Sequence, residues 1–202
     1  MDKDQNTEQK IIEAARNVFI RKGYAGARMQ EIADEAQINK ALLHYYFRSK
    51  EKLFDKIFKQ AFKSLIPNVL RILESDDSLE DTIRNFVDYY IDFINANRYL
   101  PSFILHEINQ NPEKLAGQLP AENIPNTAFY TKIIREAEAG RIKFMSPVEL
   151  FINLLSLCVF PFAARPILTQ VFDMDEDQFN EFLMNRKKTI PNMIMAYLKA
   201  EN

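Results

Sequence analysis

Apolar side chains recur at intervals of three and four residues along residues 53–65, and this repeat constrains the fold more than any other feature. The positions are Leu53, Phe54, Ile57, Phe58, Ala61, Phe62 and Leu65. Such spacing places side chains on one face of an α-helix, whereas a half-buried strand alternates at every second residue. Only 4 glycines occur in 202 residues, few for the tight turns of an all-β or doubly wound α/β protein. We therefore expect an all-α protein.

Capping residues and helix breakers divide the chain into a series of helices. The expected helices cover residues 6–23, 28–36, 39–46, a long segment from 50, 78–96, 101–109, 126–139, 147–163 and 175–198. We expect Ser49, Ser78 and Ser146 to cap helix N-termini and Gly140 to end a helix in the left-handed conformation. Residues 111–125 contain three prolines and a glycine, which predicts a segment that is mainly loop.

The net charge of −2 hides an uneven distribution of charge along the chain. Residues 1–60 carry 12 Lys and Arg against 9 Asp and Glu, whereas the remaining 142 residues carry 14 against 19. A mildly basic N-terminal part followed by an acidic C-terminal part fits a protein that contacts DNA at one end. An ordinary solvated surface is the alternative explanation.

The N-terminus is charged and lacks an apolar stretch, and no apolar run approaches the roughly 18 residues of a membrane span. We therefore expect a soluble cytoplasmic protein without membrane contact. Its one cysteine, Cys158, lies among apolar residues. Core filling is its expected role, and redox sensing is the alternative.

The short segment 39–46 has the pattern of a helix with one apolar face and one face free for contact. With Leu43 turned inward, Phe47 falls about 40° away on the same face, while Ala41 and Tyr45 point outward. The outward face carries Lys40, Ala41, His44 and Tyr45. A major groove about 12 Å wide admits one helix and offers acceptors to lysine and thymine methyl groups to apolar side chains. The pattern therefore favours a DNA-reading helix.

A longer segment around this helix resembles the N-terminal DNA-binding domain of TetR-family regulators. The matching residues are Gly23-Tyr24, Met29-Gln30-Glu31-Ile32-Ala33-Asp34-Glu35-Ala36, Asn39-Lys40 and Leu43-His44-Tyr45-Tyr46-Phe47-Arg48-Ser49-Lys50-Glu51-Lys52-Leu53-Phe54. The resemblance implies a three-helix helix-turn-helix DNA-binding domain in residues 1–50. A long helix would join it to a helical ligand-sensing and dimerisation domain in residues 51–202.

The resemblance also implies which residues meet DNA. Base-contacting positions correspond to Lys40, Ala41, Leu42 and Tyr45, and phosphate-contacting positions to His44, Tyr46 and Lys50. Asn39 begins the reading helix, and Arg28 is added as a phosphate ligand because of its charge and position. Tyr46 lies about 60° from the inward centre, so a core position is the alternative for it.

Three residues depart from the family pattern. Gln37 and Ala41 stand where glycine is frequent, and Ala27 stands where a Thr or Ser commonly caps the first short helix. Gln37 must adopt a turn conformation that glycine takes without strain, at a cost of about 1 kcal/mol. The missing hydroxyl at Ala27 costs roughly 1 kcal/mol as a lost cap. We expect an atypical operator rather than a lost motif.

The C-terminal part combines aromatic side chains with a few polar groups, which suits a pocket for a partly apolar molecule. The candidate ligand-binding residues are Phe86, Tyr89, Tyr90, Phe93, Phe103, His106 and Phe129. An aromatic stripe at helical spacing is also typical of a plain core.

Two C-terminal helices are candidates for a two-fold dimer interface, because segment 147–163 is apolar on most faces and burial on two sides is expected. The candidate interface residues are Phe151, Leu155, Cys158, Phe162, Phe182 and Met193. Completion of a monomeric core is the alternative.

These observations predict a homodimeric transcriptional regulator, a repressor released from a palindromic operator in double-stranded DNA by an unidentified small-molecule effector. It needs no cofactor or metal. An enzyme is the first rival, but with only 2 histidines the chain shows neither a Cys/His metal cluster nor a nucleophile with its base. A helical interaction module that has lost DNA binding is the second rival, and salt-dependent binding to a specific duplex distinguishes it from a regulator.

Overall fold

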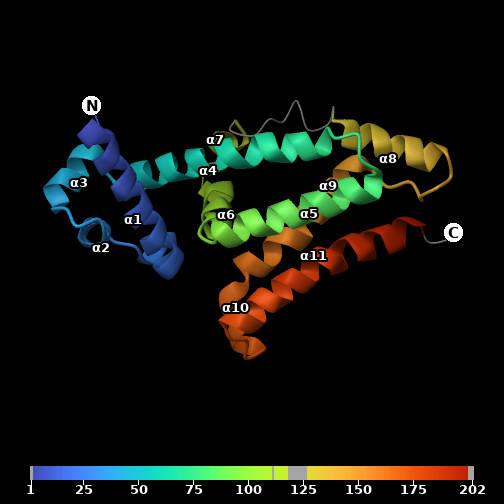
Figure 1. Cartoon of the computed structure of the whole chain (residues 1–202). Helices are drawn as coiled ribbons and strands as arrows, with labels where there is room; N and C mark the ends of the chain where they lie inside the picture. The colour runs from blue at the N-terminus through green and yellow to red at the C-terminus, as the bar shows by residue number, and fades with distance from the viewer. Residues whose placement is uncertain (1, 111, 118–126, 200–202) are drawn as a thin grey trace. The chain divides into compact units, whose positions relative to one another are not determined.

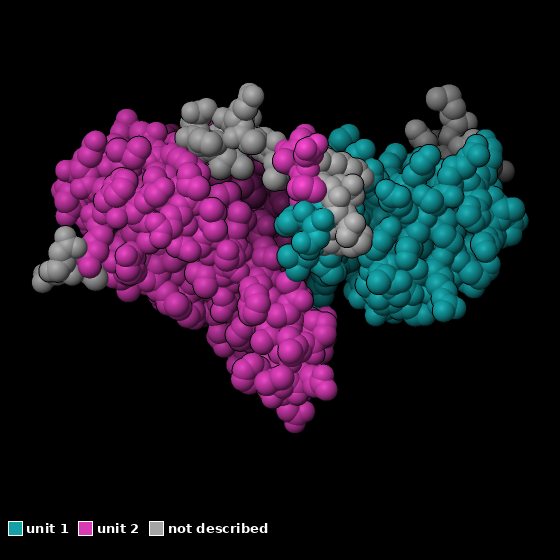
Figure 2. All heavy atoms as spheres, turned by 180° about the vertical axis from the view of Figure 1, so that it is seen from behind, with its two compact units in different colours: residues 1–64, 97–110 teal, residues 65–96, 111–202 magenta. Residues whose placement is uncertain are grey.

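The computed structural model describes residues 2–110, 112–117 and 127–199, with every side chain in them except those of residues 2–5, 106, 110 and 114. All regular elements in this part of the chain are α-helices (Figure 1). The all-α class expected from the helical spacing is therefore confirmed. The helices form two compact units, coloured separately in Figure 2.

Unit 1 comprises residues 1–64 and 97–110. It contains α1 (Asp2–Gly26), α2 (Met29–Glu35), α3 (Lys40–Tyr46), the first part of α4 (Lys50–Leu73) and α6 (Leu100–Gln110). Its core is aromatic: Phe54 stacks on Phe103 with ring centroids 3.9 Å apart, and Tyr24 meets these rings edge-on at 5.1 and 5.6 Å. Side chains of α4 and α6 therefore complete the core of the N-terminal helices.

Unit 2 comprises residues 65–96 and 111–202. It contains the rest of α4 with α5 (Leu79–Ala96), α7 (Pro112–Ala116), α8 (Ala128–Glu138), α9 (Pro147–Ala163), α10 (Arg165–Val171) and α11 (Glu176–Lys199). Helix α5 packs against α8, α9 and α11 and buries Ile83, Phe86, Val87 and Ile91 at helical spacing. Unit 2 is thus a helical bundle with its own apolar core.

Most of the expected helix ends are confirmed. The Ser49 hydroxyl accepts the amide of Lys52 at 3.2 Å, the Ser78 hydroxyl accepts that of Asp81 at 3.1 Å, and Gly140 has a φ of 69°. Ser146 precedes α9 as expected, but its side chain makes no capping hydrogen bond.

Two short helices were not expected. Helix α7 lies within segment 111–125, and α10 lies between α9 and α11. Each is a brief turn of helix between longer ones, so its sequence shows too few apolar repeats to detect. Among the described helices none alone is long and apolar enough to cross a membrane, although α9 and α10, bent by 66° at their junction, meet that test together.

The compact units do not follow the domain boundary expected at residue 50. The first part of α4 and all of α6 belong to unit 1. The reason is packing: Phe54, Phe58 and Phe103 are all nearly fully buried in the core that also holds Tyr24. A division based on the helix-turn-helix motif alone cannot include a helix that returns to this core from residue 97 onward.

Candidate nucleic-acid interface

Helix α3 is held by a cap at its start and by apolar anchors beneath it. The Asn39 side-chain oxygen accepts the amide of Leu42 at 2.7 Å, so this side chain satisfies an amide that the helix leaves free. Leu43 is completely buried and Phe47 is 7% exposed. These anchors fix which face of the helix points outward.

The outward face of α3 is the strip expected from the sequence. Lys40, Ala41, His44 and Tyr45 are exposed, and Tyr45 is 78% exposed. Tyr46 is half-buried, and the Tyr45 and Tyr46 rings meet edge-on at 5.5 Å. One short strip therefore presents a cation, a methyl group, an imidazole and an aromatic ring with its hydroxyl.

The turn between α2 and α3 contains the strain expected at Gln37, whose φ is 56°. The Gln37 amide donates to Asp34 at 3.1 Å and the Ile38 amide donates to Ala33 at 3.0 Å, the two bonds of a Schellman motif. The turn therefore forms with glutamine in the position that normally favours glycine.

The N-cap of α2 is Arg28, whereas the sequence pattern predicted a cap at position 27. Ala27 is 2% exposed, and the Arg28 amide donates to the Glu31 carboxylate at 3.3 Å. This bond replaces part of the missing hydroxyl cap. The Arg28 side chain is exposed and stays a candidate phosphate ligand.

Two ion pairs that the sequence pattern did not predict join α2 to α1. Lys22 lies 2.6 Å from Glu31, and Arg21 binds Glu35 through two bonds of 3.2 and 2.7 Å. The hydrogen bond from Lys22 lowers the pKa of Glu31, and that from Arg21 lowers the pKa of Glu35. Pairs this exposed add little stability, so they link α2 to α1 without contributing much to the packing of the two helices.

Lys50 is half-buried rather than exposed. Its ammonium group donates to the carbonyls of Tyr24, Ala25 and Ala27 at 2.8, 3.4 and 3.0 Å. It also lies 4.6 Å from the centre of the Tyr24 ring. The side chain predicted to hold phosphate is therefore engaged within unit 1.

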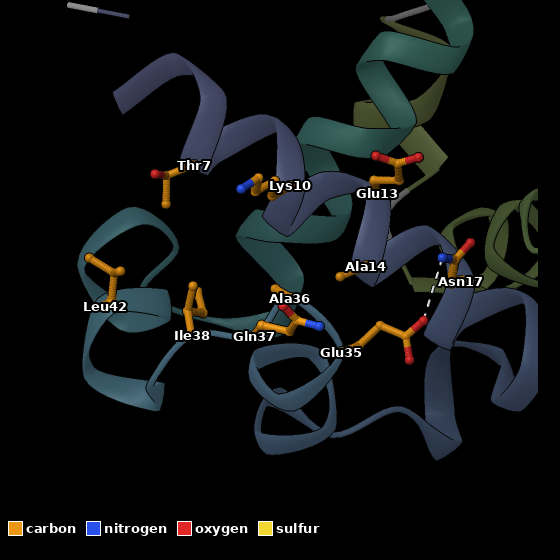
Figure 3. A pocket seen from close by; sticks show the side chains of 10 residues that line it. All are labelled: Thr7, Lys10, Glu13, Ala14, Asn17, Glu35, Ala36, Gln37, Ile38 and Leu42. Atoms are coloured by element: carbon orange, nitrogen blue, oxygen red, sulfur yellow. Dashed lines mark hydrogen bonds between the residues drawn. The ribbon is translucent and has the colours of Figure 1, made fainter. Parts of the chain in front are cut away.

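A groove of about 400 Å³ lies beside α3 (Figure 3). Side chains of α1, among them Thr7 and Lys10, face Gln37, Ile38 and Leu42 across it. Leu42, a predicted base contact, is 36% exposed and lines this groove. It therefore lies to one side of the outward strip.

The structure places the predicted ligand-binding residues in different surroundings. Phe86, Tyr90 and Phe129 are buried in the core of unit 2, and the Phe86 and Tyr90 rings stack at 5.3 Å. Tyr89 and Phe93 pack partly buried against the same core. Phe103 belongs to the core of unit 1, and the side chain of His106 lies outside the described residues. Unit 2 therefore contains five of the seven, three of them in its core and two packed against it.

The predicted interface residues also separate by burial. Cys158 and Phe162 are 1% and 6% exposed in the core of unit 2, so their side chains already pack within the subunit. Phe151, Leu155 and Phe182 are half-buried, and Met193 is 56% exposed. Five other large apolar side chains, which the sequence pattern did not single out, are exposed on the same helices: Val148, Ile152, Phe160, Met184 and Tyr197.

A hollow of about 430 Å³ lies between α9 and α11, with Leu157, Met193 and Tyr197 in its wall. In the described part of the chain, no group of three or more His, Cys, Asp or Glu side chains is placed to hold a metal ion.

Comparisons with known sequences find similar proteins for the helix-turn-helix segment and for nearly the whole chain. Residues 11–57 match the family described as bacterial regulatory proteins, tetR family. IcaR, the negative transcriptional regulator of the biofilm operon icaADBC in Staphylococcus epidermidis, is 27% identical over 194 residues, which cover 95% of this chain and 99% of IcaR. IcaR of Staphylococcus aureus is 24% identical over 193 residues, with coverage of 95% and 99%.

Solved structures share the fold. HlyIIR, a hemolysin II transcriptional regulator, has a TM-score of 0.59 at 22% identity, with 98% of this chain and 99% of that chain covered. FadR from Bacillus subtilis, solved in complex with stearoyl-CoA, has a TM-score of 0.64 at 14% identity, with coverage of 94% and 98%. The match to the tetR family of bacterial regulatory proteins therefore covers the segment that forms the helix-turn-helix, and the chain as a whole shares the fold of these solved structures.

Proposed function

We propose that this protein is a sequence-specific DNA-binding transcriptional repressor that a small-molecule ligand releases from its operator. The observation that carries the proposal is the outward strip of α3, where Tyr45 is 78% exposed above the buried anchors Leu43 and Phe47. An aromatic ring exposed to this degree does not gain the free energy of burial in the isolated protein. When the helix enters a major groove, the ring gains that free energy by contact with base edges.

The DNA contacts are proposed for a limited set of side chains. Bases would meet Lys40, Ala41 and Tyr45, with Leu42 at the margin, and phosphates would meet Arg28, His44 and Tyr46. The Asn39 side chain would act through the cap of α3 because it already accepts the Leu42 amide.

A homodimer is the proposed binding form. Its support is the exposure of Val148, Ile152 and Phe160 on α9, and of Met193 and Tyr197 on α11, each at least half exposed in the single chain. A two-fold contact of these helices would cover this apolar surface. Two copies of α3 about 34–36 Å apart would then meet successive major grooves of a palindrome.

Ligand release is proposed by analogy with relatives and neighbours. IcaR proteins are negative transcriptional regulators, and FadR from Bacillus subtilis is solved with stearoyl-CoA. A ligand that binds better to a form of the dimer in which the two copies of α3 are differently spaced would lower operator affinity. The size of this effect is limited by the ligand's difference in affinity for the two forms. Unit 2 would hold such a ligand, with its aromatic core side chains as the candidate lining.

The test is a selection of bound fragments from the source genome, followed by titration of the best duplex across salt concentrations. A specific duplex should bind about 10³-fold or more tightly than a scrambled duplex, and affinity should fall linearly on a double-logarithmic salt plot. Equal affinity for both duplexes, or no binding at low salt, would favour an interaction module that has lost DNA binding.

A further inference from the structure

The ammonium group of Lys50 occupies a site whose geometry suits a cation. A lysine ammonium has three N–H donors, and three carbonyls lie within 3.4 Å of it, from Tyr24, Ala25 and Ala27. The face of the Tyr24 ring, 4.6 Å away at its centre, adds a cation–π contact. Donors and acceptors are therefore matched in number.

The carbonyls are available because of how α1 ends. Helix α1 is kinked at Gly23, whose φ is 67°, and ends at Gly26, so the carbonyls of residues 24–27 lie at its C-terminal end. Carbonyls at a helix C-terminus lack intrahelical donors and carry partial negative charge. A cation at this point stabilises a turn that would otherwise depend on water.

We infer that Lys50 is a positioning residue for DNA binding: its ammonium holds the α1–α2 turn instead of binding a phosphate. This inference rests on the proposed function. Ala27, one of the three acceptors, directly precedes Arg28, the N-cap of α2. Lys50 therefore ties the start of α4 to the start of α2 and sets the direction from which α2 and α3 meet DNA.

The first experiment replaces Lys50 with arginine and with methionine, and makes the same changes at the exposed neighbour Lys52 as a control. Arginine is an excellent phosphate ligand, but its planar fork cannot direct three N–H groups at three convergent carbonyls. Lys50→Arg should therefore weaken operator binding about tenfold or more, comparable to losing one base contact. Lys52→Arg should change it less than twofold.

The ratio of operator to non-specific affinity is a measurement that a purely stabilising residue would not affect, and the salt slope separates a positioning residue from a phosphate ligand. Binding is measured where circular dichroism shows each variant fully folded. Lys50→Met should lower the ratio of operator to non-specific affinity and leave the salt slope within the range of the Lys52→Met control. A phosphate ligand would instead reduce the slope by about 0.9 per contact removed.

Chemical restoration covers the case in which Lys50→Met does not fold. Cys158 is 1% exposed, and its burial raises its pKa to about 12, so a new cysteine at position 50 should be alkylated selectively. Bromoethylamine converts Lys50→Cys into a lysine analogue, and iodoacetamide adds a neutral group. The aminoethyl form alone should recover operator affinity.

Two results would overturn the inference: full operator affinity in Lys50→Arg, or a slope reduction near 0.9 per contact in Lys50→Met beyond its control. Both are read against the unsubstituted protein. If that protein shows no preference for an operator, the proposed function fails, whereas a specific parent with an unaffected Lys50→Arg variant refutes the positioning function alone.

Discussion

Replacement of Gln37 by glycine should stabilise the protein, although it removes a whole side chain. Gln37 has a φ of 56°, and the left-handed conformation costs an L-residue about 1–2 kcal/mol. Glycine avoids that cost but loses about 0.5–1 kcal/mol more backbone entropy on folding. The net gain in free energy of unfolding is therefore about 1 kcal/mol.

The chain contains a matched site for the reverse substitution. Helix α8 ends in the same motif as α2: the Gly140 amide donates to Ala137 at 2.9 Å and the Arg141 amide donates to Glu136 at 3.0 Å. Gly140 has a φ of 69°, and a Cβ there would meet no atom within 4 Å. Gly140→Gln should therefore cost about 1 kcal/mol through backbone conformation alone.

Urea unfolding followed by circular dichroism measures both changes as shifts in midpoint at constant m value. In a thermal melt, 1 kcal/mol corresponds to about 2–4 °C if the chain unfolds as one unit, and about 4–8 °C if unit 1 unfolds alone. Gln37→Ala is the control, because it removes the side chain from the groove beside α3 but keeps the Cβ. A Gln37→Gly variant no more stable than Gln37→Ala, or a Gly140→Gln variant as stable as its parent, would refute the reasoning.

Three other predictions each concern a single side chain. Tyr45→Ala should weaken operator binding more than non-specific binding, because the exposed ring is proposed to read bases; equal losses on both duplexes in an anisotropy titration would contradict this. Arg186 donates to the Leu157 carbonyl at 2.6 Å, and Pro161 has no amide to offer that carbonyl, so Arg186→Met should lower the free energy of unfolding by about 1–3 kcal/mol. Adding Pro161→Ala should recover part of that loss, as measured by urea unfolding. No recovery would show that the unpaired Leu157 carbonyl is not the cause. Cys158, with its pKa raised to about 12 by burial, should react with a thiol reagent near neutral pH only in urea, and rapid modification of the native protein would show that the core opens.

Local patterns in the sequence were sufficient to predict the helix-turn-helix and its outward strip. Leu43 and Phe47 are the buried anchors that the helical spacing indicated, and Tyr45 is exposed opposite them. The left-handed turns at Gln37 and Gly140 were also expected. Such features depend on residues within one or two helical turns, which contain the information about period, cap and breaker.

Features that depend on distant segments were decided only by the tertiary structure. Phe103 was a candidate ligand-binding residue together with Phe86, but it packs on Phe54 in unit 1. On α9 most faces are apolar, so its pattern could not show that Cys158 is covered while Phe160 is 63% exposed. Lys50 looked like a free cation until the fold placed it against the carbonyls that follow Gly23. The sequence by itself determined the long helices and most of their ends, because those choices are local. The tertiary structure decided which face of each helix is buried, because burial depends on the segments that cover it.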